Sequence, residues 1–196
     1  INGRRVGNEV LAPAFTKYDK TVLYQTHDIT MMLSTGKNVI GVILGNGWYN
    51  CFTKDVWNFQ QAPWRDQPKL LLQIHIRFVD GEEKTVISDK TWKWNTGPII
   101  FDGLRNGEYY DARLEKPGWA TPEFNDSDWM NVIIIPGPGG VLRSQQMTPI
   151  KITDMIVPVC LKEVHQDVWV YDLGQSISGW AQIKVNGPSG ATIVLK

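Results

Sequence analysis

Short apolar stretches recur along this chain about every 8–12 residues, with glycine- and proline-rich turns between them. The clearest is 69–79, where apolar side chains fall on one face and polar ones, including His75, fall on the other. Asp80-Gly81 then favours a hairpin turn, after which 84–87 returns as the partner strand. No long helical pattern interrupts this series. The spacing therefore predicts an all-β protein, built as a sandwich or a barrel.

The remaining apolar stretches divide into two series. In the first, we expect strands at 23–28, 38–44, 91–94, 98–101 and 132–135, with single helical turns after Thr30 and at 124–129. In the second, we expect strands at 154–163, 168–172, 179–185 and 192–195.

Five consecutive turn residues, Pro136 to Gly140, form the strongest boundary signal in the chain. We therefore predict a complete β-sandwich over 1–140, followed over 141–196 by a linker and the opening strands of a second sandwich. The chain has no initial Met and ends within a strand pattern, so we expect it to be a piece of a longer protein.

Composition excludes several classes of protein. Hydrophobic residues make up 42% of the chain, which is enough to exclude intrinsic disorder. The 20 basic and 20 acidic residues balance, so no electrostatic surface for nucleic acid or for an anionic membrane is indicated. No apolar run approaches the roughly 18 residues of a membrane-spanning helix. The two cysteines cannot form a disulfide framework.

Catalytic motifs are missing from the sequence. The three histidines lie in strand patterns, outside any nucleophile motif, and no cysteine or histidine spacing is typical of a metal site. A glycine-rich phosphate loop is also missing, because Gly45-Asn46-Gly47 has neither a third glycine nor a following helix. Paired carboxylates remain to be considered, because glycoside hydrolysis needs only two.

The octet 106–113 concentrates charged and phenolic side chains, namely Glu108, Tyr109, Tyr110, Asp111 and Arg113. Two interpretations stay open. In the structural one, Asp111 pairs with Arg113 and the tyrosines close the end of the sandwich. In the functional one, Glu108, Tyr110, Asp111 and Arg113 form a polar patch that contacts a sugar or a neighbouring domain.

Nine tryptophans are many for a chain of this length. Most of them are expected to pack in the core, but Trp48 and Tyr49 follow a turn, and Trp64 lies in the long polar loop 50–67. Sugar sites use aromatic faces together with polar groups, so Asn46, Trp48, Tyr49 and Trp64 are carbohydrate-binding candidates.

Several motifs occur in the order found in bacterial α-L-rhamnosidases, and the chain resembles that family over nearly its whole length. The motifs are Asn2-Gly-Arg-Arg-Val-Gly7, Val22-Leu-Tyr-Gln-Thr26, Leu44-Gly-Asn-Gly-Trp-Tyr49, Asp66-Gln-Pro68, Gly107-Glu-Tyr-Tyr-Asp-Ala-Arg113 and Asn125-Asp-Ser-Asp-Trp129. Past the predicted boundary, Tyr171-Asp-Leu-Gly-Gln175 and Ser178-Gly-Trp180 resemble the start of that family's next β-sandwich.

The resemblance implies a fold and a role. Residues 1–140 would form a jelly-roll (galactose-binding-like) β-sandwich, part of an inverting hydrolase that removes terminal L-rhamnose from plant-type glycosides or polysaccharides. The catalytic carboxylates of such enzymes lie in a downstream (α/α)₆ barrel, so no catalytic residue is expected here. The partners would be that catalytic domain and a rhamnose-containing carbohydrate, with neither nucleic acid nor membrane. A periplasmic or extracellular location is favoured over a cytoplasmic one.

In some members of the family the jelly-roll binds rhamnose through calcium, although no cofactor is required. The resemblance would place calcium near Asn46, Asn95 and Pro98, where the 45–47 turn contributes no carboxylate. A scaffold role, in which the sandwich packs against the barrel, is the other implied function. Two different functions stay open as alternatives: the carbohydrate-binding sandwich of another glycosidase, and an adhesive sandwich with no enzyme attached.

Overall fold

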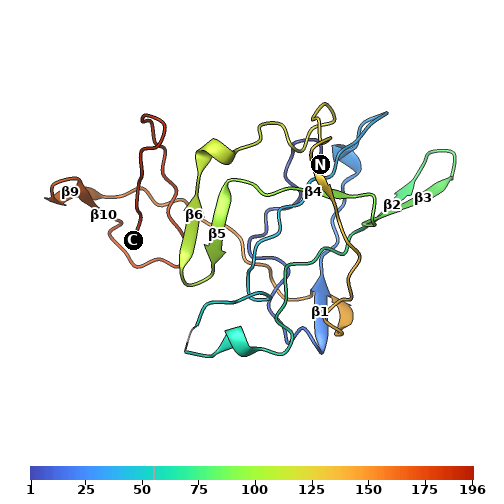
Figure 1. Cartoon of the computed structure of the whole chain (residues 1–196), viewed down its shortest axis with the longest axis horizontal. Coiled ribbons are helices and arrows are strands. Elements are labelled where there is room, and N and C mark those ends of the chain that lie inside the picture. Colours follow the sequence, from blue (N-terminus) through green and yellow to red (C-terminus); the bar gives the residue numbers. More distant parts are fainter. Residues whose placement is uncertain (55) are drawn as a thin grey trace. The chain divides into compact units, whose positions relative to one another are not determined.

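The computed structural model describes residues 1–54 and 56–196. The chain divides into two compact units, 1–151 and 152–196, each described here by itself (Figure 1). The described part contains β-strands and three short 3₁₀ helices, η1 (Thr30–Met32), η2 (Phe59–Gln61) and η3 (Ala112–Leu114), and no α-helix. The predicted all-β class is therefore confirmed.

Local hairpins account for two ladders of the first unit. β2 (Gln73–Arg77) pairs antiparallel with β3 (Glu83–Ile87), and the turn at Asp80-Gly81 is the predicted one. Gly81 has a φ of +89°, a left-handed conformation that glycine adopts without steric cost. β5 (Ile99–Gly103) pairs antiparallel with β6 (Gly107–Tyr110), which places Asp102 opposite Glu108.

Two further ladders join segments far apart in the chain. β1 (Thr21–Tyr24) runs parallel to β8 (Val141–Ser144), and β4 (Lys93–Trp94) pairs antiparallel with β7 (Met130–Asn131). Because β8 pairs with β1, the segment after Gly140 belongs to the first unit, and the structural division falls after 151.

The second unit contains one antiparallel ladder, between β9 (Cys160–His165) and β10 (Val168–Asp172). The predicted strand 168–172 is found with those bounds. The expected strands at 179–185 and 192–195 are not formed, because the backbone there takes no ladder partner.

Strand prediction was also wrong at 38–44 and 132–135, where both segments are apolar but unpaired. The first makes separate contacts instead. The N–H of Asn2 donates to the carbonyl of Val39 (3.0 Å), and a Cβ on Gly41 would lie 2.3 Å from the Trp119 ring. The most buried residues of the described chain, Ile1, Asn50 and Cys51, lie near these contacts or in the loop that follows Trp48.

Candidate functional site

Seven aromatic side chains of the first unit form one network of ring contacts, called here the aromatic cluster. Its members are Phe15, Tyr18, Trp48, Tyr49, Trp57, Phe59 and Trp64. Two segments supply them, 15–18 and 48–64. Three of the four sequence candidates from this region, Trp48, Tyr49 and Trp64, therefore lie in the cluster.

Trp48 is held between two other rings. Its centroid lies 5.4 Å from that of Phe15 and 5.3 Å from that of Phe59, and its side chain is half-buried. Edge and tilted ring contacts of this kind add stability beyond the contribution from burying the rings. Trp48 thus packs within the cluster, whereas Trp57 is its most exposed member, with 59% of its surface accessible.

Arg105 covers one face of Trp57. The guanidinium carbon lies 4.0 Å from the ring centroid, within the range of a cation–π contact. Arg105 comes from the turn between β5 and β6, far from Trp57 in sequence. Sequence reasoning missed this pair because a stacking contact between distant loops has no sequence signal.

A chain of hydrogen bonds anchors the loop that carries these rings. The carboxylate of Asp102 in β5 accepts from the backbone N–H of Asn46 (2.8 Å) and from its side-chain amide (2.6 Å). The oxygen of Asn46 accepts from Asn50 (2.6 Å), whose own oxygen accepts from Arg65 (3.0 Å). The turn 46–50 and the end of the loop at Arg65 are therefore tied to one strand.

Four polar atoms in or beside the cluster are buried without a hydrogen-bond partner in the described structure: Asp19 Oδ1, Tyr49 Oη, Gln60 Oε1 and Trp64 Nε1. Tyr18, next to Asp19, contacts Trp64 with ring centroids 6.2 Å apart. A buried polar group left unsatisfied costs roughly 1–3 kcal/mol. These atoms offer an indole donor, two acceptor oxygens and a phenol hydroxyl beside aromatic rings.

Burial also acts on Tyr18 itself. Desolvation, with a smaller effect of the nearby Tyr49 phenol, raises the pKa of Tyr18 to about 12. Lys69, also close to Tyr49, has its pKa raised chiefly by hydrogen bonding to Asp66, whose carboxylate lies 2.8 Å away.

The octet 106–113 forms β6 and the turn into η3. Arg113 pairs with Asp111 at 2.6 Å, and the Asp111 carboxylate also caps η3 by accepting from the Arg113 N–H. Hydrogen bonds from Arg113 lower the pKa of Asp111 to about 2. Tyr110 donates to Glu115, which raises the Tyr110 pKa, and Glu108 is exposed on β6. The Asp111–Arg113 pair is the one that the structural interpretation expects, and a binding role for these residues stays a prediction.

The oxygens suggested for calcium already accept hydrogen bonds. Asn46 Oδ1 accepts from Asn50, Asn95 Oδ1 from the Thr96 N–H, and the Pro98 carbonyl from the Asp111 N–H. Calcium needs six to eight oxygens. These three neutral oxygens are fewer than the ion requires, although the Asp102 carboxylate beside Asn46 adds one acidic group that the sequence pattern did not place there. Calcium binding stays a prediction.

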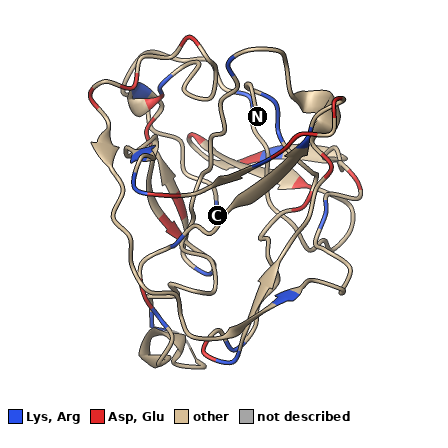
Figure 2. Ribbon diagram, turned by 90° about the vertical axis from the view of Figure 1, so that its right-hand side faces the viewer, with Lys and Arg blue, Asp and Glu red and all other residues tan. Residues whose placement is uncertain are grey.

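Charge is distributed evenly over the molecule. Figure 2 shows basic and acidic residues interspersed along the ribbon, without a long run of either sign. No helix in the described part of the chain is long and apolar enough to span a membrane.

Two family models match the sequence. Residues 1–154 match the α-L-rhamnosidase N-terminal domain, and residues 162–196 match the bacterial α-L-rhamnosidase concanavalin-like domain.

Curated relatives agree with these matches. An α-L-rhamnosidase of Streptomyces avermitilis is 34% identical over the whole chain, and one of Formosa agariphila is 32% identical over 98% of it. The chain spans about a fifth of the length of these relatives, since it covers 19% of the first and 20% of the second.

Solved structures resemble the fold. The α-L-rhamnosidase of Dictyoglumus thermophilum matches 89% of this chain with a TM-score of 0.80 and 41% identity, over 18% of its own length. The Streptomyces avermitilis enzyme, solved in complex with L-rhamnose, matches 89% of this chain with a TM-score of 0.77 and 31% identity, over 17% of its length.

Proposed function

Because this chain belongs to the α-L-rhamnosidase family, we propose that it is a non-catalytic accessory region of an enzyme that releases terminal L-rhamnose from glycosides or polysaccharides. It serves as a scaffold for a catalytic domain elsewhere in the same protein, and its aromatic cluster binds carbohydrate. The family match favours this function over a sandwich from an unrelated glycosidase and over an adhesive module.

The bonding partners of three Asp carboxylates support the non-catalytic role. Inverting hydrolysis needs one carboxylic acid and one carboxylate about 6.5–9.5 Å apart, with room for a water between them. Here Asp102 holds Asn46, Asp111 pairs with Arg113, and Asp66 pairs with Lys69. These groups stabilise loops and turns.

One observation carries the carbohydrate-binding proposal: the indole N–H of Trp64 is buried beside aromatic rings and has no acceptor in the described structure. Once the side chains that cover these atoms move aside, a sugar hydroxyl would supply that acceptor, and the unpaired oxygens of Asp19 and Gln60 would accept hydrogen bonds from neighbouring hydroxyls. Aromatic rings would contact the C–H faces of the sugar. Neutral carbohydrate also suits a surface without excess charge.

The scaffold role rests on the same loop. Hydrogen bonds among Asp102, Asn46, Asn50 and Arg65 hold the two ends of loop 50–67 to β5, which favours a defined surface there for a neighbouring domain or a glycan. Phe52, Val56 and Trp57 in this loop are exposed and offer apolar contact area.

Isothermal titration of the 196-residue chain with L-rhamnose tests the carbohydrate-binding proposal, in calcium and again in EDTA. Saturable heat in both buffers supports a metal-independent site at the aromatic cluster. Heat in calcium only supports the calcium-dependent mode predicted from the family resemblance. The absence of heat in either buffer would refute carbohydrate binding by this chain and leave only the scaffold role.

A further inference from the structure

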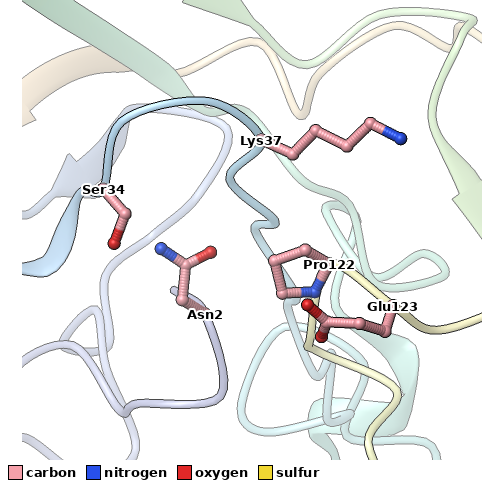
Figure 3. A pocket seen from close by; sticks show the side chains of 5 residues that line it. All are labelled: Asn2, Ser34, Lys37, Pro122 and Glu123. Carbon is pink, nitrogen blue, oxygen red and sulfur yellow. The ribbon is translucent and has the colours of Figure 1, made fainter.

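A polar pocket lies in the first unit and is lined by residues outside the aromatic cluster. Its lining residues are Asn2, Ser34, Lys37, Pro122 and Glu123 (Figure 3). The cavity has a volume of about 630 Å³, within the roughly 300–1,000 Å³ typical of small-molecule sites. Three segments distant in sequence meet there.

Hydrogen bonds fix the wall that contains Asn2 and Ser34. The Asn2 amide donates to the carbonyl of Met32 (3.1 Å) and to Asn38 Oδ1 (2.8 Å), and its oxygen accepts from the Val39 N–H (2.9 Å). Asn38 in turn binds both backbone groups of Ser34, at 2.8 Å each. The Ser34 backbone is therefore held in place, and its hydroxyl is left for another partner.

Hydrogen bonds also hold the opposite wall of the pocket, which contains Pro122 and Glu123. The N–H of Gly3 donates to the carbonyl of Ala120 (2.8 Å), and Thr121 binds back to the Gly118 carbonyl through both its N–H and its hydroxyl (2.9 Å each). Pro122 and Glu123 follow directly. In Figure 3 the Pro122 ring and the Glu123 carboxylate lie across from Asn2 and Ser34.

The remaining polar groups of the pocket have no bonding partner in the described structure, and their formal charges cancel. Within the described residues, neither Lys37 nor Glu123 has an ion-pair partner, and the Ser34 hydroxyl has no hydrogen-bond partner. The Lys37 side chain is extended, and its ammonium lies on the side away from Asn2 and Ser34 (Figure 3). The pocket thus combines one cation, one anion and one hydroxyl with an apolar proline ring, and its formal charge is zero.

That combination selects a ligand class. Because the charges of Lys37 and Glu123 cancel, the pocket as a whole attracts neither anions nor cations, whereas a neutral ligand can use both groups as hydrogen-bond donor and acceptor. A polyhydroxylated ligand satisfies both kinds of group, and its C–H face can lie on the Pro122 ring. We infer that this pocket binds a saccharide unit, as a second carbohydrate contact separate from the aromatic cluster.

This inference rests on the proposed function for the class of its ligand, a carbohydrate, but it concerns different residues. NMR titration of the ¹⁵N-labelled 196-residue chain with methyl α-L-rhamnopyranoside therefore distinguishes the two. We expect saturable shifts at the backbone N–H groups of Ser34, Lys37 and Glu123. Glu123→Gln and Lys37→Met should each weaken binding at these signals at least fivefold and leave the signals of Trp48 and Trp64 responsive.

Matched controls come from the exposed β2–β3 hairpin and the turn after it. Glu82→Gln and Lys90→Met make the same chemical changes outside the pocket and should leave the affinity at Ser34 unchanged. Shifts confined to the aromatic cluster would overturn the second site and leave the proposed function standing. A pocket response that survives both Glu123→Gln and Lys37→Met would also overturn it. No response at either place would refute both proposals.

Discussion

Asp102 and Asn46, fifty-six residues apart, are joined by three hydrogen bonds, two of them to the Asp102 carboxylate and one to its carbonyl. This contact fixes the turn 45–50 to β5. Hydrogen bonds to a charged group contribute about 1.5–3 kcal/mol each in net stability. We expect Asp102→Ala to lower the free energy of unfolding by about 2–3 kcal/mol, measured by urea denaturation followed by tryptophan fluorescence.

Asp128→Ala is the matched control, because Asp128 is exposed and makes no hydrogen bond that the structure records. Its unfolding free energy should stay within about 0.5 kcal/mol of the parent value. Equal destabilisation by the two substitutions would contradict the anchoring role of Asp102.

Gly140 precedes β8 at a point where no side chain fits. A Cβ there would lie 2.3 Å from the carbonyl oxygen of Tyr18 and 2.7 Å from the Thr21 nitrogen, both backbone atoms. Gly140→Ala should therefore separate β8 from β1 and cost about 1–3 kcal/mol, the usual range for overpacking. Differential scanning calorimetry should show a lower melting temperature.

Gly137 provides the comparison, since a Cβ there would have nothing within 4 Å. Gly137→Ala should be neutral or stabilise by up to about 1 kcal/mol, because alanine restricts the unfolded chain. Similar melting temperatures for the two variants would show that the β1–β8 contact does not need a glycine at 140.

The sequence predicted strands well where alternation was strict and the partner was local. β2, β3 and their turn follow from the pattern of 69–87, and β10 follows from 168–172. β8 was not predicted as a strand, because its pairing with β1 depends on residues more than a hundred positions away. The apolar segments 38–44 and 132–135 show the converse: in the described part of the chain each makes a single backbone-to-backbone hydrogen bond, Asn2 N–H to the Val39 carbonyl and Val132 N–H to the Trp92 carbonyl, but neither forms a strand ladder.

In the candidate site, too, local features were predicted and long-range contacts were missed. Trp48, Tyr49 and Trp64 were predicted because they share one loop with a turn signal. Asp102 and Arg105 were missed, because their contacts with Asn46 and Trp57 arise only when the β5–β6 hairpin folds against that loop. The sequence also did not predict that Phe15 and Phe59 contact the Trp48 ring, and a binding role for Trp48 stays a prediction.

The buried phenol of Tyr18 makes the free energy of unfolding depend on pH in the alkaline range. Its pKa is raised to about 12 in the folded chain, from an ordinary value of 10, so the folded state keeps a proton that the unfolded state loses. Its contribution to stability is complete below pH 10 and is lost as pH rises toward 12. Tyr18→Phe should flatten the fall in unfolding free energy between pH 10 and 12, measured by urea titration at each pH.

Tyr24→Phe serves as the control for that experiment, because Tyr24 is 45% exposed and the substitution removes the same hydroxyl at another position. Its pH profile should follow that of the parent chain. A profile for Tyr18→Phe that coincides with the parent would show that burial of this phenol does not contribute to the alkaline loss of stability.

Two Trp→Phe substitutions separate binding from stability, because each removes an indole N–H and keeps an aromatic ring. The Trp92 N–H donates to the Ile87 carbonyl at 3.2 Å, whereas the Trp64 N–H has no acceptor in the described structure. Trp92→Phe should cost about 0.5–1.5 kcal/mol of stability and leave L-rhamnose affinity unchanged. Trp64→Phe should retain or slightly raise stability, because it removes an unsatisfied donor, and weaken L-rhamnose binding at least fivefold. Urea denaturation and isothermal titration of both variants measure the two effects. Unchanged affinity in Trp64→Phe would remove the indole N–H from the carbohydrate contact and, with it, the main support for binding at the aromatic cluster.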